Sequence, residues 1–276
     1  MTETIDQPLA WHSGNILPLK DLSVSAGDSA LEHGLGLFES MRSEKGQVPL
    51  LSRHLDRMTR SALELGLKLN ISQLPDIVAI TELVDRCRLA SGSGRLRMVL
   101  TGGCRGESGK IWVTANSLDQ LDCDNLKLSS DFWPVDERDD LVRFKTLNYW
   151  LRRRAFERAT AGGCHEIISV DSNGYLWEGS RTAIFLVKND QILSPPADGP
   201  MLASIAAEVV RELALEMDMP TVYKPLRIDD LMAADEVILT NALRGILSVG
   251  KFGEFSYSTP GNVTKALRKC WKNKYF

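Results

Sequence analysis

A run of short apolar strands joined by tight turns, within residues 166–193, constrains the fold of this 276-residue chain more than any other feature. The turn signals are Asp-Ser-Asn-Gly and Lys-Asn-Asp. Turns this short join antiparallel strands, whereas parallel strands need a crossover of about a dozen residues. The pattern therefore predicts hairpins and excludes a strict βαβ alternation. The predicted strands are residues 166–170, 175–177, 182–187 and 191–193.

Apolar residues at helical spacing predict four helices between such strands. The first begins with Ser52 as its N-cap, and the second follows Pro75. A further hairpin is expected around a glycine-rich loop, and one more strand comes late in the chain. The predicted class is α/β of the α+β type. The two later helices cover residues 148–160 and 204–217, the hairpin pairs 97–100 with 111–113, and the late strand is 237–240.

The length of the chain allows one or two domains. A polar, acidic stretch at residues 116–125 is the best candidate boundary, because elsewhere apolar strands and helices follow one another closely. We therefore predict a smaller N-terminal domain at 1–117, a linker at 118–125 and a larger C-terminal domain at 126–276.

Composition excludes several functional classes. With 33 basic and 36 acidic residues, net charge −3, the chain has no basic footprint for nucleic acid. The five cysteines form no C-x-x-C pair and the four histidines share no ligand spacing, which argues against disulfides and metal. No signal peptide or membrane-spanning run is present. These observations predict a cytoplasmic protein with a small-molecule substrate and no metal, nucleic-acid or membrane partner.

Lys145 and Glu178 are the first two residues that could carry chemistry. Lys145 lies among apolar residues where an irregular segment meets a helix, and a partly desolvated lysine can act as an amine nucleophile. The alternative is an ordinary solvated lysine. Glu178 follows an apolar strand, where a buried carboxylate needs a cationic partner. Its alternative is a strand-end acid in solvent or a partner for Arg181.

Arg57 and a helix N-terminus are the next candidates. Arg57 shares one helix face with His54, Ser61 and Glu64, so it either belongs to a solvated stripe or binds a phosphate. The segment beginning at Ser204 opens a helix whose free amides could hold an anion. In contrast, the run Arg152-Arg153-Arg154 is interpreted as a solvated helix face.

Together these four features are the parts of a pyridoxal phosphate site. A lysine holds the cofactor aldehyde as a Schiff base, and a carboxylate keeps the pyridine nitrogen protonated. An arginine and helix amides hold the phosphate.

Several segments, in order from about residue 23 to 249, resemble motifs of the class IV aminotransferase family, the fold-type IV pyridoxal phosphate enzymes. The lysine segment is similar to the family's K-x-x-N motif, and residues 174–178 are similar to G-x-x-x-E. The full set is Asp28 with 33–42, His54-Leu55-Asp56-Arg57, Lys145-Thr146-Leu147-Asn148-Tyr149, 174–178, Leu202-Ala203-Ser204-Ile205, and 234–237 with 240–243.

The resemblance implies two α/β domains with pyridoxal 5'-phosphate in the cleft between them, in a homodimer whose sites borrow residues across the interface. It implies that Lys145, in the C-terminal domain, forms the Schiff base, and that Glu178 pairs with the pyridine nitrogen. It also implies that Arg57 binds the phosphate. The other implied cofactor residues are Ser204, Ile205, Ala206, Asn241 and Ala242, and the implied substrate residues are Phe38, Arg97 and Tyr149.

Four positions depart from the family pattern: Leu35, Ala183, Ala206 and Ala207. They bear on phosphate binding and substrate identity, and they leave Lys145 and Glu178 intact.

The resemblance leaves three activities open, and the amino substrate is not predicted, because it depends on pocket shape. The first choice is aminodeoxychorismate lyase, in which an external aldimine forms, Lys145 acts as general base, and pyruvate and p-aminobenzoate are released. The short chain and residues 240–243 favour this reaction. The alternative is an aminotransferase of branched-chain or D-amino acids, and a more remote one is a catalytically degenerate homologue that binds the cofactor.

Overall fold

The computed structural model describes residues 7–119 and 122–276, which group into two compact units. The first unit contains residues 7–119 together with Lys145–Asn148, and the second contains 122–144 and Tyr149–Phe276. Lys145 thus packs with the first unit, although the sequence prediction assigned it to the C-terminal domain. The predicted linker at 118–125 remains a prediction, and its residues 120 and 121 lie outside the described part of the chain.

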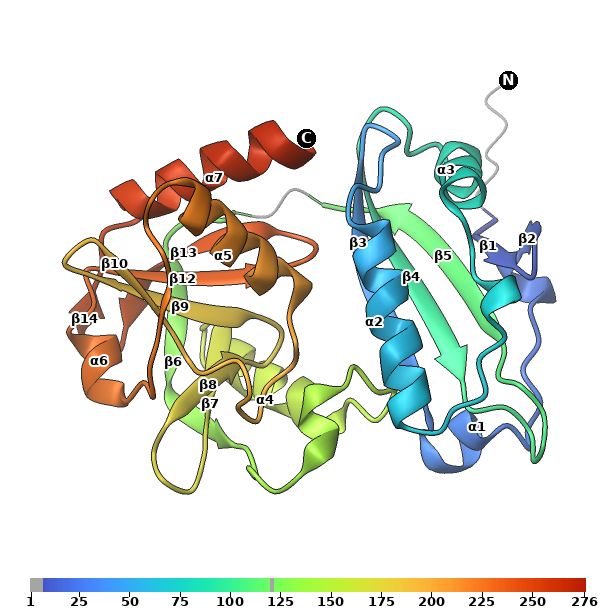
Figure 1. Cartoon of the computed structure of the whole chain (residues 1–276), viewed down its shortest axis with the longest axis horizontal. Coiled ribbons are helices and arrows are strands. Elements are labelled where there is room, and N and C mark those ends of the chain that lie inside the picture. Colours follow the sequence, from blue (N-terminus) through green and yellow to red (C-terminus); the bar gives the residue numbers. More distant parts are fainter. Residues whose placement is uncertain (1–6, 120–121) are drawn as a thin grey trace. The chain divides into compact units, whose positions relative to one another are not determined.

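The first unit is built on a five-stranded sheet in the order β2-β1-β5-β4-β3, with every neighbouring pair antiparallel (Figure 1). The pairing of β4 with β5 confirms the predicted glycine-rich hairpin. The elements are β1 (Leu9–His12), β2 (Asn15–Pro18), α1 (Ser29–His33), β3 (Gly36–Glu44), α2 (Leu51–Glu64), α3 (Ile77–Arg86), β4 (Ser93–Thr101) and β5 (Ile111–Ser117), with 3-10 turns at Leu19–Asp21 and Ile71–Gln73.

Of the two long helices of this unit, α3 begins where the sequence indicates and α2 does not. Helix α3 begins as its sequence indicates, with Asp76 as N-cap accepting from the Ala79 amide at 2.8 Å. The predicted Ser52 cap of α2 is wrong: the helix already begins at Leu51, its N-cap is Leu50, and no side chain caps it. A Val48 carbonyl that accepts from the Leu51 amide starts the turn earlier.

Side chains of β3 alternate between the two faces of this sheet. Glu39 points toward α2, where it meets polar side chains of that helix. Phe38 and Ser40 therefore lie on the opposite face, and Ser40 pairs directly with Arg97 of β4. Neighbouring residues of β3 therefore serve opposite faces of the sheet. Glu39 lies on the face with Arg57, and Phe38 lies on the face with Arg97.

The second unit carries a nine-stranded mixed sheet in the order β11-β10-β9-β12-β13-β6-β7-β8, with β14 paired to β13. β8 also pairs with β9 through Glu178 and Ala183, so six strands form a closed ring of pairings. The strands are β6 (Leu126–Pro134), β7 (Glu166–Val170), β8 (Leu176–Gly179), β9 (Ala183–Lys188), β10 (Gln191–Ser194), β11 (Val222–Tyr223), β12 (Glu236–Asn241), β13 (Gly245–Phe252) and β14 (Phe255–Ser256).

Helices α5 and α7 pack against each other and over β12 (Figure 1). The interior between strands is filled by a cluster that includes Leu128, Ile168, Ile184 and Leu239, none more than 2% exposed. In the described part of the chain no helix is both long and apolar enough to cross a membrane. The helices of this unit are α4 (Trp150–Ala161), α5 (Ile205–Glu216), α6 (Ile228–Met232) and α7 (Asn262–Tyr275), with a 3-10 turn at Asp140–Arg143.

The hairpins expected at 166–193 are present, and two boundaries, one in β8 and one at the start of α4, differ from prediction. β8 extends to Gly179, so Glu178 lies inside a strand rather than after one. The helix expected from Asn148 begins only at Trp150, because the preceding residues are extended and bonded to β3.

Candidate active site

Lys145 is held beside an edge strand. The Phe38 amide donates to the Lys145 carbonyl at 2.9 Å, and the Leu147 amide donates to the Gly36 carbonyl at 2.9 Å. A Cβ at Gly36 would lie 2.6 Å from both the Leu100 carbonyl and a Leu147 methyl, so only glycine permits this approach. The backbone of the lysine segment is thereby fixed along β3.

The side chains of Lys145 and Arg97 both approach the ring of Phe38. Lys145 Nζ lies 4.6 Å from the ring centroid, and Arg97 Cζ lies 4.0 Å from it. Phe38 is 4% exposed. Cation–π contacts at these distances hold both side chains against the ring. The first unit therefore brings together a predicted nucleophile and two of the three predicted substrate residues.

Arg57 is anchored by a buried carboxylate that the sequence reasoning did not single out. Glu39 accepts from Arg57 Nε at 2.8 Å and from Arg57 Nη2 at 2.5 Å. His54 Nδ1 lies 2.8 Å from the second carboxylate oxygen. All three side chains are at most 10% exposed, so the alternative of a solvated stripe is wrong for this part of α2.

The charges of this cluster are strongly coupled. Burial would raise the pKa of Glu39, but the Arg57 charge and the hydrogen bonds from His54 and Arg57 lower it to about 2. Burial also lowers the pKa of His54, against the attraction of Glu39. At neutral pH the cluster is therefore a carboxylate, a guanidinium and a neutral imidazole.

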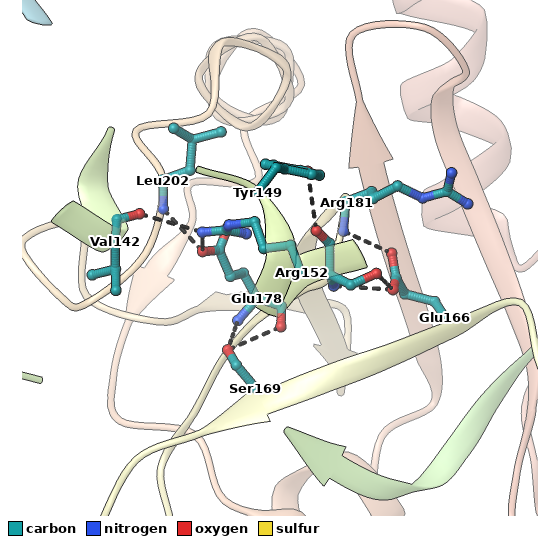
Figure 2. A network of polar contacts seen from close by, with 9 residues as sticks. Val142, Tyr149, Arg152, Glu166, Ser169, Glu178, Arg181 and Leu202 are labelled. Carbon is teal, nitrogen blue, oxygen red and sulfur yellow. Dashed lines mark hydrogen bonds and ion pairs between the residues drawn. The ribbon is translucent and has the colours of Figure 1, made fainter. Parts of the chain in front are cut away.

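Glu178 is buried on β8 and pairs with Arg152 of α4, not with Arg181 (Figure 2). The guanidinium of Arg181 instead lies over the Phe156 ring. Glu178 Oε1 accepts from Arg152 Nη2 and from the Leu202 amide, the latter at 3.1 Å. Its backbone exchanges two hydrogen bonds of 3.1 Å with the Ser169 hydroxyl. Both sequence-based alternatives for Glu178 are therefore wrong.

Arg152 is buried, although the sequence predicted a solvated side chain. It stands in a run of three arginines expected to be solvated, yet its side chain is 13% exposed. Nη2 also donates to the Val142 carbonyl at 3.3 Å, and Cζ lies 5.5 Å from the Trp133 ring centroid. Burial alone would lower the pKa of Arg152, but the carboxylate of Glu178 raises it.

Tyr149 belongs to the same unit as Glu178. Its hydroxyl donates to the Ser180 carbonyl at 3.3 Å, and burial raises the pKa of the phenol, so it stays protonated at neutral pH. The Ser180 turn is held by Glu166, a second buried carboxylate missed in the sequence (Figure 2). Its donors are the amides of Ile167, Ser180 and Arg181 and the hydroxyls of Ser180 and Thr182.

The predicted phosphate residues lie at the start of α5 and in a second turn. Ser204 is the N-cap, and its hydroxyl oxygen accepts from the Ala207 amide at 3.2 Å. Ile205 and Ala206 are buried in the first helical turn, whose amides point out of the helix end. Asn241 closes the turn before Gly245: its side-chain oxygen accepts from the Leu243 and Arg244 amides, and Ala242 lies inside that turn.

The structure links some of the predicted residues and not others. Leu202 connects the segment before α5 to Glu178 through its amide hydrogen bond. Within residues 7–119 and 122–276, no hydrogen bond joins Asn241 or Ala242 to another predicted site residue. Of the missed residues, Glu39 was present in the F-E motif, whereas Arg152 and Glu166 carried no local signal because their partners are distant in sequence.

Comparison with known proteins gives a family match over most of the chain. Residues 36–252 match the family model described as Amino-transferase class IV. A Methanocaldococcus jannaschii protein named "Putative branched-chain-amino-acid aminotransferase" is 30% identical, covering 95% of this chain and 94% of that protein. An aminodeoxychorismate lyase of Bacillus subtilis is 23% identical, covering 96% and 94%.

Solved structures share the fold. The branched-chain amino acid aminotransferase of Escherichia coli superposes with a TM-score of 0.87 at 20% identity, covering 98% of this chain and 95% of that one. A hypothetical aminotransferase from Mycobacterium tuberculosis, in its PLP-bound form, gives 0.82 at 20% identity, covering 97% and 98%. The likeness confirms the predicted mixed α/β fold of the fold-type IV group.

Proposed function

Because the chain belongs to the class IV aminotransferase family and is therefore an enzyme, we propose that it is a pyridoxal 5'-phosphate-dependent aminotransferase acting on a small amino substrate. The relative at 30% identity carries a branched-chain aminotransferase name, which supports that substrate class. One observation carries the proposal: Glu178 is buried, its Oε1 is occupied, and its Oε2 accepts no hydrogen bond from the described residues.

The chemistry of the donor set fits this cofactor. Lys145 offers the amine that an aldehyde needs, and Glu178 offers a carboxylate oxygen for a protonated ring nitrogen. Glu39 aligns Arg57 through Nε and Nη2, two of the three nitrogens of a group suited to phosphate. The first amides of α5 suit the same anion. When bound, the cofactor supplies an electron sink for the substrate carbon beside the amine.

Three residues of the chain would attach the cofactor, hold its ring nitrogen and bind the substrate. Lys145 would hold the cofactor through its aldehyde, and its Nζ, when neutral and released from that bond, would accept the proton from the substrate carbon beside the amine. Glu178 holds a proton at the ring nitrogen through Oε2. Arg97, oriented by its contact with Phe38, attracts the substrate carboxylate.

Aminodeoxychorismate lyase is the second candidate. Residues 240–243, Thr-Asn-Ala-Leu, resemble the lyase form of this segment, and one curated relative carries that name. The two activities share the proton removal by Lys145. They differ in the step after it, since an aminotransferase releases a keto acid and the lyase expels pyruvate.

The test uses the purified, cofactor-loaded protein and a panel of amino acids without any keto acid. An aminotransferase converts the bound cofactor to its amine form, and its visible absorbance is lost. Pyruvate released from aminodeoxychorismate with unchanged absorbance identifies the lyase instead. The Lys145→Ala variant should show neither the visible band nor either reaction. A colourless wild-type protein that takes up no added cofactor would refute the proposal.

We also propose that the chain acts as a homodimer in the cytoplasm. Leu31, Trp150 and Leu151 are large apolar side chains that are each more than 60% exposed, and such side chains gather at interfaces between subunits. All five cysteines have free thiols, which suits a reducing compartment. Light scattering should give the mass of two chains, and replacing Trp150 and Leu151 by serine should reduce it to one.

A further inference from the structure

Arg152 differs sharply from its two neighbours in the same arginine run. Its side chain is 13% exposed, whereas that of Arg153 is 68% exposed and pairs with Glu157 one helical turn away. Arg154 is exposed as well. Burying a guanidinium costs free energy unless a counter-charge pairs with it. Of the three arginines, Arg152 is the one that is buried, so its contacts must offset this cost.

The contacts of Arg152 fix one oxygen of Glu178. Its Nη2 donates to Glu178 Oε1 and to the Val142 carbonyl, so the guanidinium is tied to the backbone of residue 142 as well. The Leu202 amide donates to the same Oε1 at 3.1 Å (Figure 2). Two donors on Oε1 determine the rotation of the carboxylate. Oε2, which accepts no hydrogen bond from the part of the chain that is described, therefore has a fixed direction.

The charge of Arg152 also determines where a shared proton resides. A carboxylate facing a ring nitrogen can hold the proton on oxygen, giving a neutral pair, or give it to nitrogen, giving an ion pair. Arg152 touches the carboxylate and is farther from any group bound at Oε2. Because Coulomb attraction falls with distance, the guanidinium stabilises the carboxylate more than it repels the protonated nitrogen. The ion pair is thereby favoured.

We propose that Arg152 is a positioning residue that directs Oε2 of Glu178 to the ring nitrogen of the cofactor and favours the ion pair over the neutral pair there. This inference rests on the proposed function of Glu178. It assigns to Arg152 an electrostatic role in addition to its packing between α4 and β8. A structural role alone would require only that the guanidinium fill its site and satisfy the Val142 carbonyl.

The experiment loads the protein with ¹⁵N-labelled pyridoxal phosphate and follows the ring-nitrogen resonance across pH. Arg152→Met keeps the length of the side chain and removes its charge, so the nitrogen should lose its proton at a pH at least about one unit lower than in wild type, equivalent to a tenfold change in the equilibrium. Proton removal from a bound amino acid should slow about tenfold with a nearly unchanged KM. Arg152→Lys should recover most of both effects.

Three further variants serve as a control, as a replacement for a variant that fails to fold, and as a test of Glu178 itself. Arg153→Met removes an exposed arginine from the same helix and should behave as wild type. If Arg152→Met does not fold or bind the cofactor, Arg152→Gln replaces it, and a wild-type nitrogen titration there overturns the inference because the charge is then not needed. Glu178→Gln separates the two proposals. If it leaves the nitrogen protonated, the proposed role of Glu178 fails; if it alone shifts the titration, only the role of Arg152 fails.

Discussion

Each unit of the molecule contains a buried arginine–glutamate pair, and the two pairs differ in how their carboxylates are bonded. In the first unit, both oxygens of Glu39 are occupied, by Arg57 and His54. In the second, Arg152 and the Leu202 amide both donate to Oε1 of Glu178, and among the described residues none donates to its Oε2. The fully engaged Glu39 positions its arginine, whereas Arg152 positions its glutamate. The two carboxylates thus differ in how many of their oxygens are occupied by donors from the described residues.

The largest expected effect comes from breaking the first pair. Glu39→Ala leaves the guanidinium of Arg57 buried without its counter-charge, and removing one partner of a buried pair costs about 3–5 kcal/mol. Urea unfolding of the cofactor-free protein should register this loss. Glu64→Ala, on the exposed end of the same helix, should change stability by less than about 0.5 kcal/mol. A small effect of Glu39→Ala would mean that the pair is not the anchor described above.

The same pair should make the protein sensitive to acid. The pKa of Glu39 is about 2 in the fold, against 4.5 for the free group, so the folded state binds the proton more weakly. The resulting stabilisation, roughly 3 kcal/mol, is complete above pH 4.5 and is lost as the pH falls from 4.5 toward 2. Unfolding curves of wild type and Glu39→Gln should converge across this window. Parallel curves would contradict the assignment.

Isosteric amides should then separate the two roles. Glu178→Gln is expected to slow proton removal from a bound amino acid about a hundredfold, because the amide cannot stabilise a protonated ring nitrogen. Glu39→Gln should instead weaken cofactor affinity with a smaller change in that rate, since it disturbs Arg57, the arginine proposed to bind the phosphate. Stopped-flow absorbance and equilibrium cofactor binding measure the two quantities. If both variants changed the rate and the cofactor affinity to the same extent, the two pairs would not have different roles.

The smallest effect is expected outside both pairs. Arg153→Ala removes an exposed i,i+4 contact with Glu157, and such contacts contribute about 0.3–0.5 kcal/mol. Thermal unfolding should therefore shift little, and the cofactor spectrum not at all. A large change would show that exposure alone does not distinguish Arg152 from its neighbour.

Much of the fold could be predicted because its signals are local. Turn residues and apolar spacing lie within a few positions of the hairpins at 166–193 and of helices α2, α3 and α5. β6 was missed because residues 126–134, Leu-Lys-Leu-Ser-Ser-Asp-Phe-Trp-Pro, lack an apolar run and pair in parallel with the distant β13 and β7. Parallel partners this far apart in sequence are also not marked by a short turn between them.

The site residues likewise fall into those with a local sequence signal and those whose partners are distant in sequence. Lys145, Arg57 and Glu178 were selected by residue type and motif order, and their roles stay proposals. The partners that determine their electrostatics were not selected: Glu39 lies 18 positions from Arg57, and Arg152 lies 26 positions from Glu178. Three adjacent arginines look identical in a sequence. Only the packing of α4 on the sheet distinguishes the buried one.

The extended lysine segment also has a consequence for how the chain is made. β3 is an outer strand of the first sheet, and residues 145–148 cover its open side through the bridge between Leu37 and Thr146. During synthesis the whole first sheet emerges before that cover exists. A nascent or truncated chain ending near residue 119 therefore presents bare backbone donors and acceptors, which favour aggregation between chains.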